Sequence, residues 1–86
     1  MIPIQQLLQR IRWDAEFGRA EFVFGYYDRV RRGIVRVPFD AMRFQPGDPL
    51  SVTAVDDDGS VHHVPLHRIR EVYRNGELIW RRPAPS

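Results

Sequence analysis

The stretch EVYRNGELIWR, residues 71–81, carries the clearest fold signal in this 86-residue chain. Asn75-Gly76 at its centre is the two-residue turn most typical of a β-hairpin, because both residues tolerate a positive φ. Valine, tyrosine, isoleucine and tryptophan flank the turn and favour strands. The turn fixes the register of the two strands, which we predict to pair as Arg74 with Glu77, Tyr73 with Leu78 and Val72 with Ile79.

Two more hairpins are predicted upstream, over 21–37 and 50–64. The first begins with a strand rich in phenylalanine, valine and tyrosine and turns at 31–33, where the last residue is glycine. The second turns at 56–59, a run of three aspartates and a glycine. Such a run is an ordinary turn sequence, and it lacks the further spaced oxygen ligands of a calcium loop. Together the three hairpins supply about six strands.

The N-terminal segment predicts a short amphipathic helix over 3–12. Its apolar residues recur at the i, i+3, i+4 and i+7 spacing of one helix face; they are Ile4, Leu7, Leu8 and Ile11. Gly18 marks a turn after the helix. We therefore expect an α+β fold in which this helix packs on a small, strongly curved antiparallel sheet of about six strands. A barrel-like closure of that sheet stays open.

An internal repeat links the first two hairpins. The segment VPFDAMR at 37–43 resembles VPLHRIR at 64–70, and each copy follows a hairpin turn that ends in glycine. Proline ends each strand because it cannot donate to the ladder, and Met42 or Ile69 then enters the core from a short helical turn. Asp40 suits the N-cap of that turn, whereas the second copy has His67. The repeat is short, so a duplicated unit and a chance similarity both remain open.

Composition narrows the classes of function. The chain has no cysteine, which excludes disulfides and thiolate metal sites. No apolar run approaches the ~20 residues that cross a bilayer, and the N-terminus lacks the features of a signal peptide. We expect a cytoplasmic protein with no membrane partner, one domain over 1–82 and a disordered tail over 83–86. Its oligomeric state is left open.

The basic residues are all arginines, 13 in number. Codon bias accounts for the absence of lysine, but it does not account for two clusters, four arginines over 29–36 and five over 68–82. Arginine presents a planar fork that matches phosphate oxygens and stacks on flat rings. Clustered arginine beside aromatic residues therefore indicates an anionic partner such as RNA.

The three histidines do not form a recognisable catalytic or metal motif. Pro65 prevents His63 and His67 from sharing one helix face, and on a strand they would lie roughly 13 Å apart. His62 and His63 would point to opposite faces, so no metal and no other cofactor is predicted. The two His-x-Thr/Ser motifs of two-histidine phosphoesterases are absent, as is any phosphate-binding glycine loop. Catalysis with His67 as an acid or base stays open as a rival.

Anion recognition accounts better for the polar residues around the second copy of the repeat. His67, Arg68 and Arg70 can supply side-chain and backbone donors to a phosphate. Tyr27 with Arg29, and Trp80 beside its arginines, combine rings with cations as unpaired bases require. The alternative is a structural role. It is favoured for Phe22, Phe24, Tyr26 and Trp13, which we predict to lie in the core.

Five motifs in order resemble the small archaeal proteins of the RNA cyclic group end recognition family. They are MIPIQQLL at 1–8, IRWD at 11–14, GYYDR at 25–29, VPLHRIR at 64–70 and GELIW at 76–80. The role proposed for that family is recognition of RNA ends with a 2′,3′-cyclic phosphate or a similar group, drawn from fusions to RNA-processing enzymes. The resemblance implies functional roles for Asp28-Arg29, His67-Arg68 and Trp80. It does not extend to His63, where a small residue such as threonine is expected.

We therefore predict a non-catalytic RNA-binding module that reads a terminal phosphate on single-stranded RNA, with RNA-processing enzymes as further partners. His67 and Arg68 would contact the phosphate, and Tyr27 or Trp80 would stack on the terminal base. An enzyme that processes cyclic ends and a protein-interaction module are the rivals. The complete candidate set is Tyr27, Asp28, Arg29, His62, His67, Arg68, Arg70 and Trp80. Whether Arg29 and His67 share one face is left open.

Overall fold

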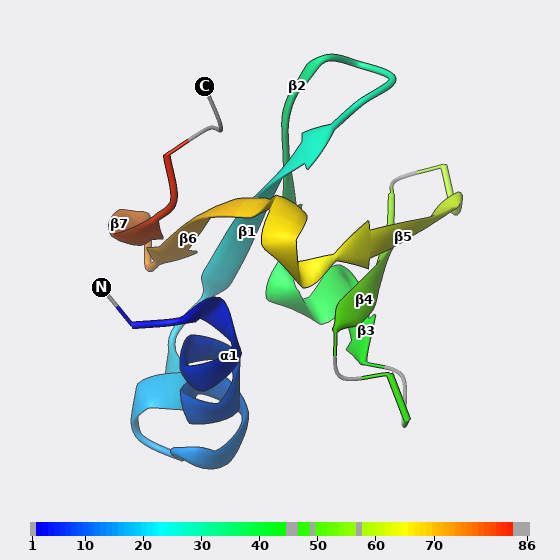
Figure 1. Ribbon diagram of the computed structural model, residues 1–86. Coiled ribbons are helices and arrows are strands. Elements are labelled where there is room, and N and C mark those ends of the chain that lie inside the picture. Colours follow the sequence, from blue (N-terminus) through cyan, green and yellow to red (C-terminus); the bar gives the residue numbers. More distant parts are fainter. Residues whose placement is uncertain (1, 45–46, 49, 57, 84–86) are drawn as a thin grey trace.

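The computed structural model describes residues 2–44, 47–48, 50–56 and 58–83 (Figure 1). One α-helix and a short 3-10 turn precede a series of strands. In chain order the elements are α1 (Ile4–Trp13), η1 (Phe17–Arg19), β1 (Phe22–Asp28), β2 (Gly33–Pro38), η2 (Phe39–Ala41), β3 (Met42–Phe44), β4 (Ser51–Val55), β5 (Val61–Pro65), η3 (Leu66–Arg68), β6 (Ile69–Arg74) and β7 (Glu77–Arg81).

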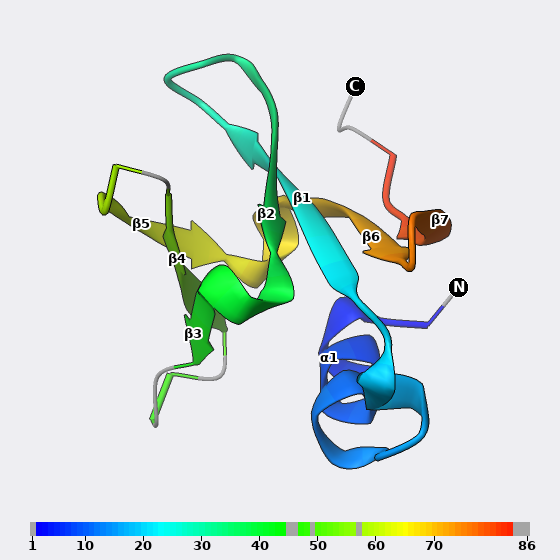
Figure 2. The same cartoon turned by 180° about the vertical axis from the view of Figure 1, so that it is seen from behind.

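The strands form two antiparallel sheets, with the orders β2-β1-β6-β7 and β3-β4-β5. The α+β class is confirmed, but the prediction of one curved sheet of about six strands is wrong. Neither described sheet closes into a barrel. The sequence did not predict β3, which has only three residues and yet pairs with β4 to extend the second sheet. In Figures 1 and 2, η2 carries the chain from β2 in the first sheet to β3 in the second, and η3 carries it back from β5 to β6.

The two copies of the sequence repeat fold in the same way. Pro38 (φ −68°, ψ 150°) and Pro65 (φ −61°, ψ 142°) end their strands in nearly the same extended conformation. A single 3-10 turn follows each proline. In the first copy the N–H of Met42 donates to the carbonyl oxygen of Phe39, and in the second Ile69 donates to Leu66. The similarity at 37–43 and 64–70 is therefore a structural repeat.

Each copy of the repeat can be taken together with the hairpin before it, so that the first unit is β1, β2, η2 and β3 and the second is β4, β5, η3 and β6. The two units exchange their third strands: β6 of the second copy pairs with β1 of the first, and β3 of the first copy pairs with β4 of the second. The partners Tyr26–Ile69 and Ala54–Met42 occupy equivalent positions in these two ladders. Ile69 and Met42 are both buried, as predicted from the repeat. Each sheet thus depends on strands from both copies.

Asp40 does not cap the first turn. Pro38 occupies the N-cap position, and no side-chain hydrogen bond caps the turn. The predicted N-cap is therefore wrong. Proline fixes φ at the value that the entry to such a turn requires, so the turn forms without a side-chain acceptor.

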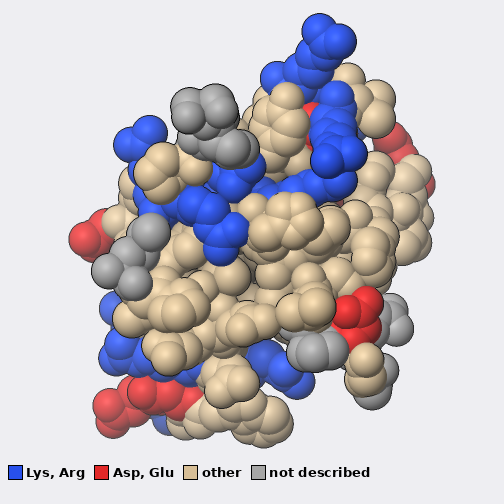
Figure 3. Space-filling view, in the orientation of Figure 1, with Lys and Arg blue, Asp and Glu red and all other residues tan. Residues whose placement is uncertain are grey.

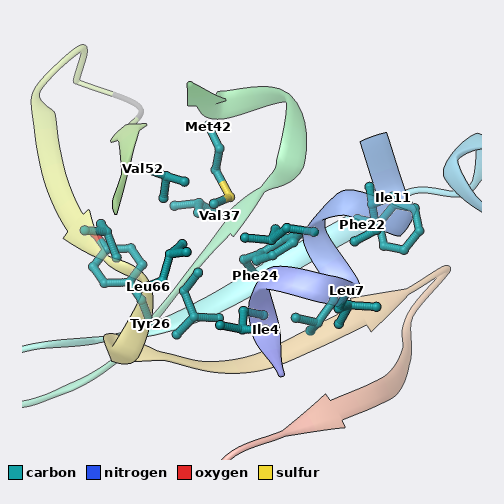
Figure 4. Close-up of a cluster of buried hydrophobic side chains, with 14 of the residues drawn as sticks. Ile4, Leu7, Ile11, Phe22, Phe24, Tyr26, Val37, Met42, Val52 and Leu66 are labelled. Carbon is teal, nitrogen blue, oxygen red and sulfur yellow. The ribbon is translucent and has the colours of Figure 1, made fainter. Parts of the chain in front are cut away.

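The helix buries the face that its periodicity predicted. Ile4, Leu7, Leu8 and Ile11 are each at most 5% exposed. Figure 4 shows Ile4, Leu7 and Ile11 directed toward Phe22, Phe24 and Leu66, side chains that come from the sheet and from η3. The apolar face of α1 therefore packs into the hydrophobic core that the described residues form.

The C-terminal hairpin keeps two of its three predicted pairs. Arg74 pairs with Glu77 and Tyr73 with Leu78, but Val72 pairs with Trp80 instead of Ile79. The register shifts between Val72 and Tyr73, which is the signature of a β-bulge. As a result Trp80 lies in the core while Ile79 is left at the surface.

Two further expectations concern the chain end and membranes. Residues 84–86 of the predicted disordered tail lie outside the described residues. None of the described helices is long and apolar enough to cross a membrane.

Gly18 tests the packing of η1 against the helix. A Cβ at this position would collide with the carbonyl oxygen of Ile11, so Gly18→Ala is expected to lower the free energy of unfolding by about 1–3 kcal/mol. Urea unfolding followed by circular dichroism measures the change. Gly33→Ala is the control, because its nearest neighbour atom is 4.0 Å away, and a change within about 0.5 kcal/mol is expected there. Equal effects of the two substitutions would contradict the packing described for Gly18.

Candidate functional site

An open cleft of about 370 Å³ lies between the end of β1 and the segment formed by β5 and η3. It gathers five of the eight predicted site residues from distant parts of the chain: Tyr27, Asp28, Arg29, His62 and Arg68. The remaining lining residues are Tyr26, Val30, Val61, His63 and Val64. The β1–β2 turn and the second copy of the repeat therefore meet at one surface.

Asp28 shapes the turn that presents Arg29. One of its carboxylate oxygens accepts the backbone N–H of Val30 at 2.8 Å and that of Arg31 at 3.3 Å. This Asx-type arrangement holds the end of β1. Arg29 and Val30 are left exposed at the rim of the cleft.

His62 is held by an acid that the sequence assigned only to a turn. Its Nε2 lies 2.8 Å from one carboxylate oxygen of Asp56. The other carboxylate oxygen of Asp56 accepts hydrogen bonds from the backbone N–H groups of Asp58 and Ser60. The hydrogen bond from His62, followed by those from the backbone, lowers the pKa of Asp56 below its ordinary value. Asp56 therefore orients the ring of His62. The position of both residues at the two ends of one hairpin loop was the signal available for this pairing.

Tyr26 forms the floor of the cleft. Its side chain is buried, and burial raises the pKa of the phenol, with further increases from the carboxylates of Asp28 and Asp56. Tyr27 follows it on β1 and is half-buried. The cleft thus has the neutral phenol of Tyr26 at its floor and the partly accessible ring of Tyr27 at its side.

His67 and Arg68 line two different hollows in the protein surface. Arg68 lines the cleft, whereas His67 lines a separate hollow with Gln5, Leu50 and Arg82. Arg29 and His67 therefore line different hollows, and a joint role of His67 and Arg68 at the phosphate stays a prediction. Successive residues of the short η3 turn project in different directions, which separates the two side chains.

Arg70 stabilises the η3 turn. Its Nη1 donates to the carbonyl oxygen of His67 at 3.1 Å, and Nη1 of Arg82 donates to the same oxygen at 2.8 Å. Arg43 makes the equivalent bond to Asp40 in the first copy of the repeat, at 2.6 Å. Arg70 is therefore part of the fold and is absent from the lining of the cleft.

The two tryptophans exchange the roles that the sequence predicted. Trp80 is only 5% exposed, and its Nε1 donates to the carbonyl oxygen of Ile2 at 2.8 Å. It cannot stack on a base, so this prediction is wrong. Trp13, predicted to lie in the core, is 75% exposed. The bulge in β7 turns Trp80 inward, and Trp13 lies at the end of α1 beyond the apolar face of the helix.

Arginine side chains gather over the upper half of the face shown in Figure 3, across the β1–β2 hairpin and the region of η3, β6 and β7. Others lie along the lower edge, and two of the arginines, Arg29 and Arg68, line the cleft. Clustered cations of this kind attract an anionic ligand more than the formal net charge of +2 suggests.

The Asp56–His62 bond predicts a pH-dependent contribution to stability. Because the pKa of Asp56 is lowered by folding, its contribution is complete above the ordinary aspartate pKa of about 3.9 and is lost as the pH falls through the lower folded value. The difference in unfolding free energy between the wild type and Asp56→Asn should be larger at pH 5 than at pH 3. Urea titrations at the two pH values measure it. Asp58→Asn is the control from the same turn, and a difference for Asp56→Asn that does not change with pH would contradict this prediction.

The sequence and structure were compared with family models and with solved structures. The model of the MJ1316 RNA cyclic group end recognition domain matches residues 1–82. No solved structure matches the chain. The match confirms the resemblance carried by the five sequence motifs and covers both copies of the repeat together with the helix. The chain therefore belongs to the MJ1316 RNA cyclic group end recognition domain family.

Proposed function

We propose that this protein is a non-catalytic RNA-binding module whose cleft takes an RNA end with a 2′,3′-cyclic phosphate. The observation that carries the proposal is the meeting of Arg29 and Arg68, from opposite halves of the chain, at one open cleft beside Tyr27 and His62. Guanidinium groups bind phosphate oxygens through paired, charge-assisted hydrogen bonds. The family name points to the same kind of ligand, a cyclic group at an RNA end.

The size and lining of the cleft suit one terminal nucleotide. Its volume of about 370 Å³ lies at the lower end of the range for small-ligand sites. Arg29 and Arg68 would hold the phosphate, and Tyr27 would stack on the base, as aromatic side chains do with unpaired bases. Asp28 and Asp56 accept hydrogen bonds from their own turns, which reduces their repulsion of the anion.

Binding accounts for this arrangement better than catalysis does. Acid–base cleavage of a phosphate ester uses groups that exchange protons near neutral pH, and arginine does not do so. His62 has one ring nitrogen committed to Asp56. His63 also lines the cleft, but it follows His62 directly on β5, so the two side chains leave opposite faces of the strand. The described lining of the cleft therefore supplies charge and shape for binding.

The first test compares two RNA ends. The wild type should bind an oligonucleotide with a cyclic phosphate more tightly than the same oligonucleotide with a 3′-hydroxyl, by fluorescence anisotropy. Arg68→Ala and Arg29→Ala should each weaken binding of the cyclic end by about 10- to 100-fold, since a hydrogen bond to a charged group contributes about 1.5–3 kcal/mol. His67→Ala should leave the preference intact, because His67 lines a different hollow.

Arg19→Ala is the matched control, because it removes one exposed arginine on η1, outside the cleft. Equal binding of the two ends by the wild type would end the proposal. Conversion of the cyclic phosphate during incubation, seen by chromatography of the recovered RNA, would favour the enzymatic rival.

Salt dependence separates phosphate contacts from an apolar protein interface. The logarithm of the affinity should fall linearly with the logarithm of the salt concentration, and Arg68→Ala should reduce the slope by about 0.7, the value for one phosphate contact on single-stranded nucleic acid. Titrations between low and moderate salt measure both slopes. An affinity that is indifferent to salt would favour the protein-interaction rival.

A further inference from the structure

A second surface runs along α1, apart from the cleft. A hollow of about 230 Å³ between the helix and strands β3 and β4 is lined by Gln5, Gln9 and Arg12 together with Phe44. A neighbouring hollow of about 410 Å³ shares Arg12 and Phe44 and adds Trp13 and Arg43. Because the two hollows share residues, they form one groove, which we call the α1 groove.

The α1 groove also reaches the η3 turn. Gln5 and Leu66 line both the hollow of about 230 Å³ and the hollow that contains His67 and Arg82. Arg68, the next residue of η3, lines the cleft. The groove and the cleft are therefore separated by the width of a single short turn.

An aromatic and cationic stack stands at the far end of the groove. The Cζ atom of Arg12 lies 4.5 Å from the ring centroid of Phe44 and 5.3 Å from that of Trp13. Trp13 itself is 75% exposed. The guanidinium orders the indole through a cation–π contact, and most of the ring surface remains available to a partner.

The remaining polar residues of the groove suit a nucleic acid. Gln5, Gln9 and Arg12 follow the i, i+4, i+7 spacing and so lie on one face of α1, where the amides can both donate to and accept from base edges. Two acids are also present. Asp48 accepts hydrogen bonds from the hydroxyl of Ser51 at 2.6 Å and from the N–H of Leu50 at 3.2 Å. Asp40 lines the same hollow as the cations Arg12 and Arg43.

We propose that the α1 groove binds the single-stranded RNA that precedes the terminal nucleotide, with a base stacked on Trp13. The order of the subsites rests on the proposed function: the end lies in the cleft, the chain crosses η3 past His67, and the upstream nucleotides follow the helix toward Trp13. An open aromatic ring, an arginine and side-chain amides match exposed bases and their phosphates. In a duplex the bases are stacked on each other, so no base face is free to contact the ring of Trp13.

A length series tests the groove independently of the end. Oligouridylates of two and of eight nucleotides, each with a 2′,3′-cyclic phosphate, are titrated against the wild type, and the longer one should bind at least about tenfold more tightly. Trp13→Ala should remove about a factor of ten from the affinity for the longer oligonucleotide and leave the shorter one unchanged. Arg12→Ala should act in the same direction.

Leu78→Ala is the matched control, because it truncates another exposed apolar side chain on β7, away from the groove. Thermal unfolding of each variant checks that the fold is retained, which is expected because Trp13 is exposed. Trp13→Phe should keep most of the affinity through its ring.

The outcomes distinguish the two proposals. Equal affinity for the two lengths, or no loss of RNA affinity in Trp13→Ala, would overturn the groove and leave the exposed ring to a protein partner. Equal binding of cyclic and 3′-hydroxyl ends, with the gain from length retained, would overturn the function proposed for the cleft and support the groove. A duplex that binds as tightly as the longer single strand would also overturn the groove.

Discussion

The structure depends on one local constraint that occurs twice, a proline that ends a strand and starts a single 3-10 turn. Pro38 and Pro65 cannot donate to a ladder and hold the backbone in the extended conformation that leads into η2 and η3. Each turn sends the chain from one sheet to the other. Met42 and Ile69 then enter the core at equivalent positions, and the exchanged third strands join the two copies.

The same turns determine which arginines remain available to a ligand. The carbonyl oxygen of His67 accepts Arg70 and Arg82, so these two cations stabilise η3. Arg68 leaves the turn on the other side and reaches the cleft. One three-residue turn thus divides its neighbouring cations between the fold and the candidate site, and it also separates the cleft from the α1 groove.

The sequence predicted the local elements well because their signals are local. The apolar face of α1 follows from helical spacing, and the C-terminal hairpin follows from Asn75-Gly76, whose positive φ angles of 51° and 83° fit the turn. The repeat was visible as a similarity of seven residues. Bulges carry no comparable signal, so the pairing of Val72 with Trp80 was missed, and a three-residue strand such as β3 is too short to show a period.

The sequence by itself determined the fold class, the helix, the hairpins, the family resemblance and a set of arginines and aromatic residues around two turns. Tertiary structure alone decided how those residues are grouped. It brought Arg29 and Arg68 to one cleft, moved His67 to another surface, buried Trp80 and exposed Trp13. The physical reason is that side-chain direction at a turn, a bulge or a helix end is set by packing against distant segments, whereas turn type and amphipathic spacing are properties of neighbouring residues.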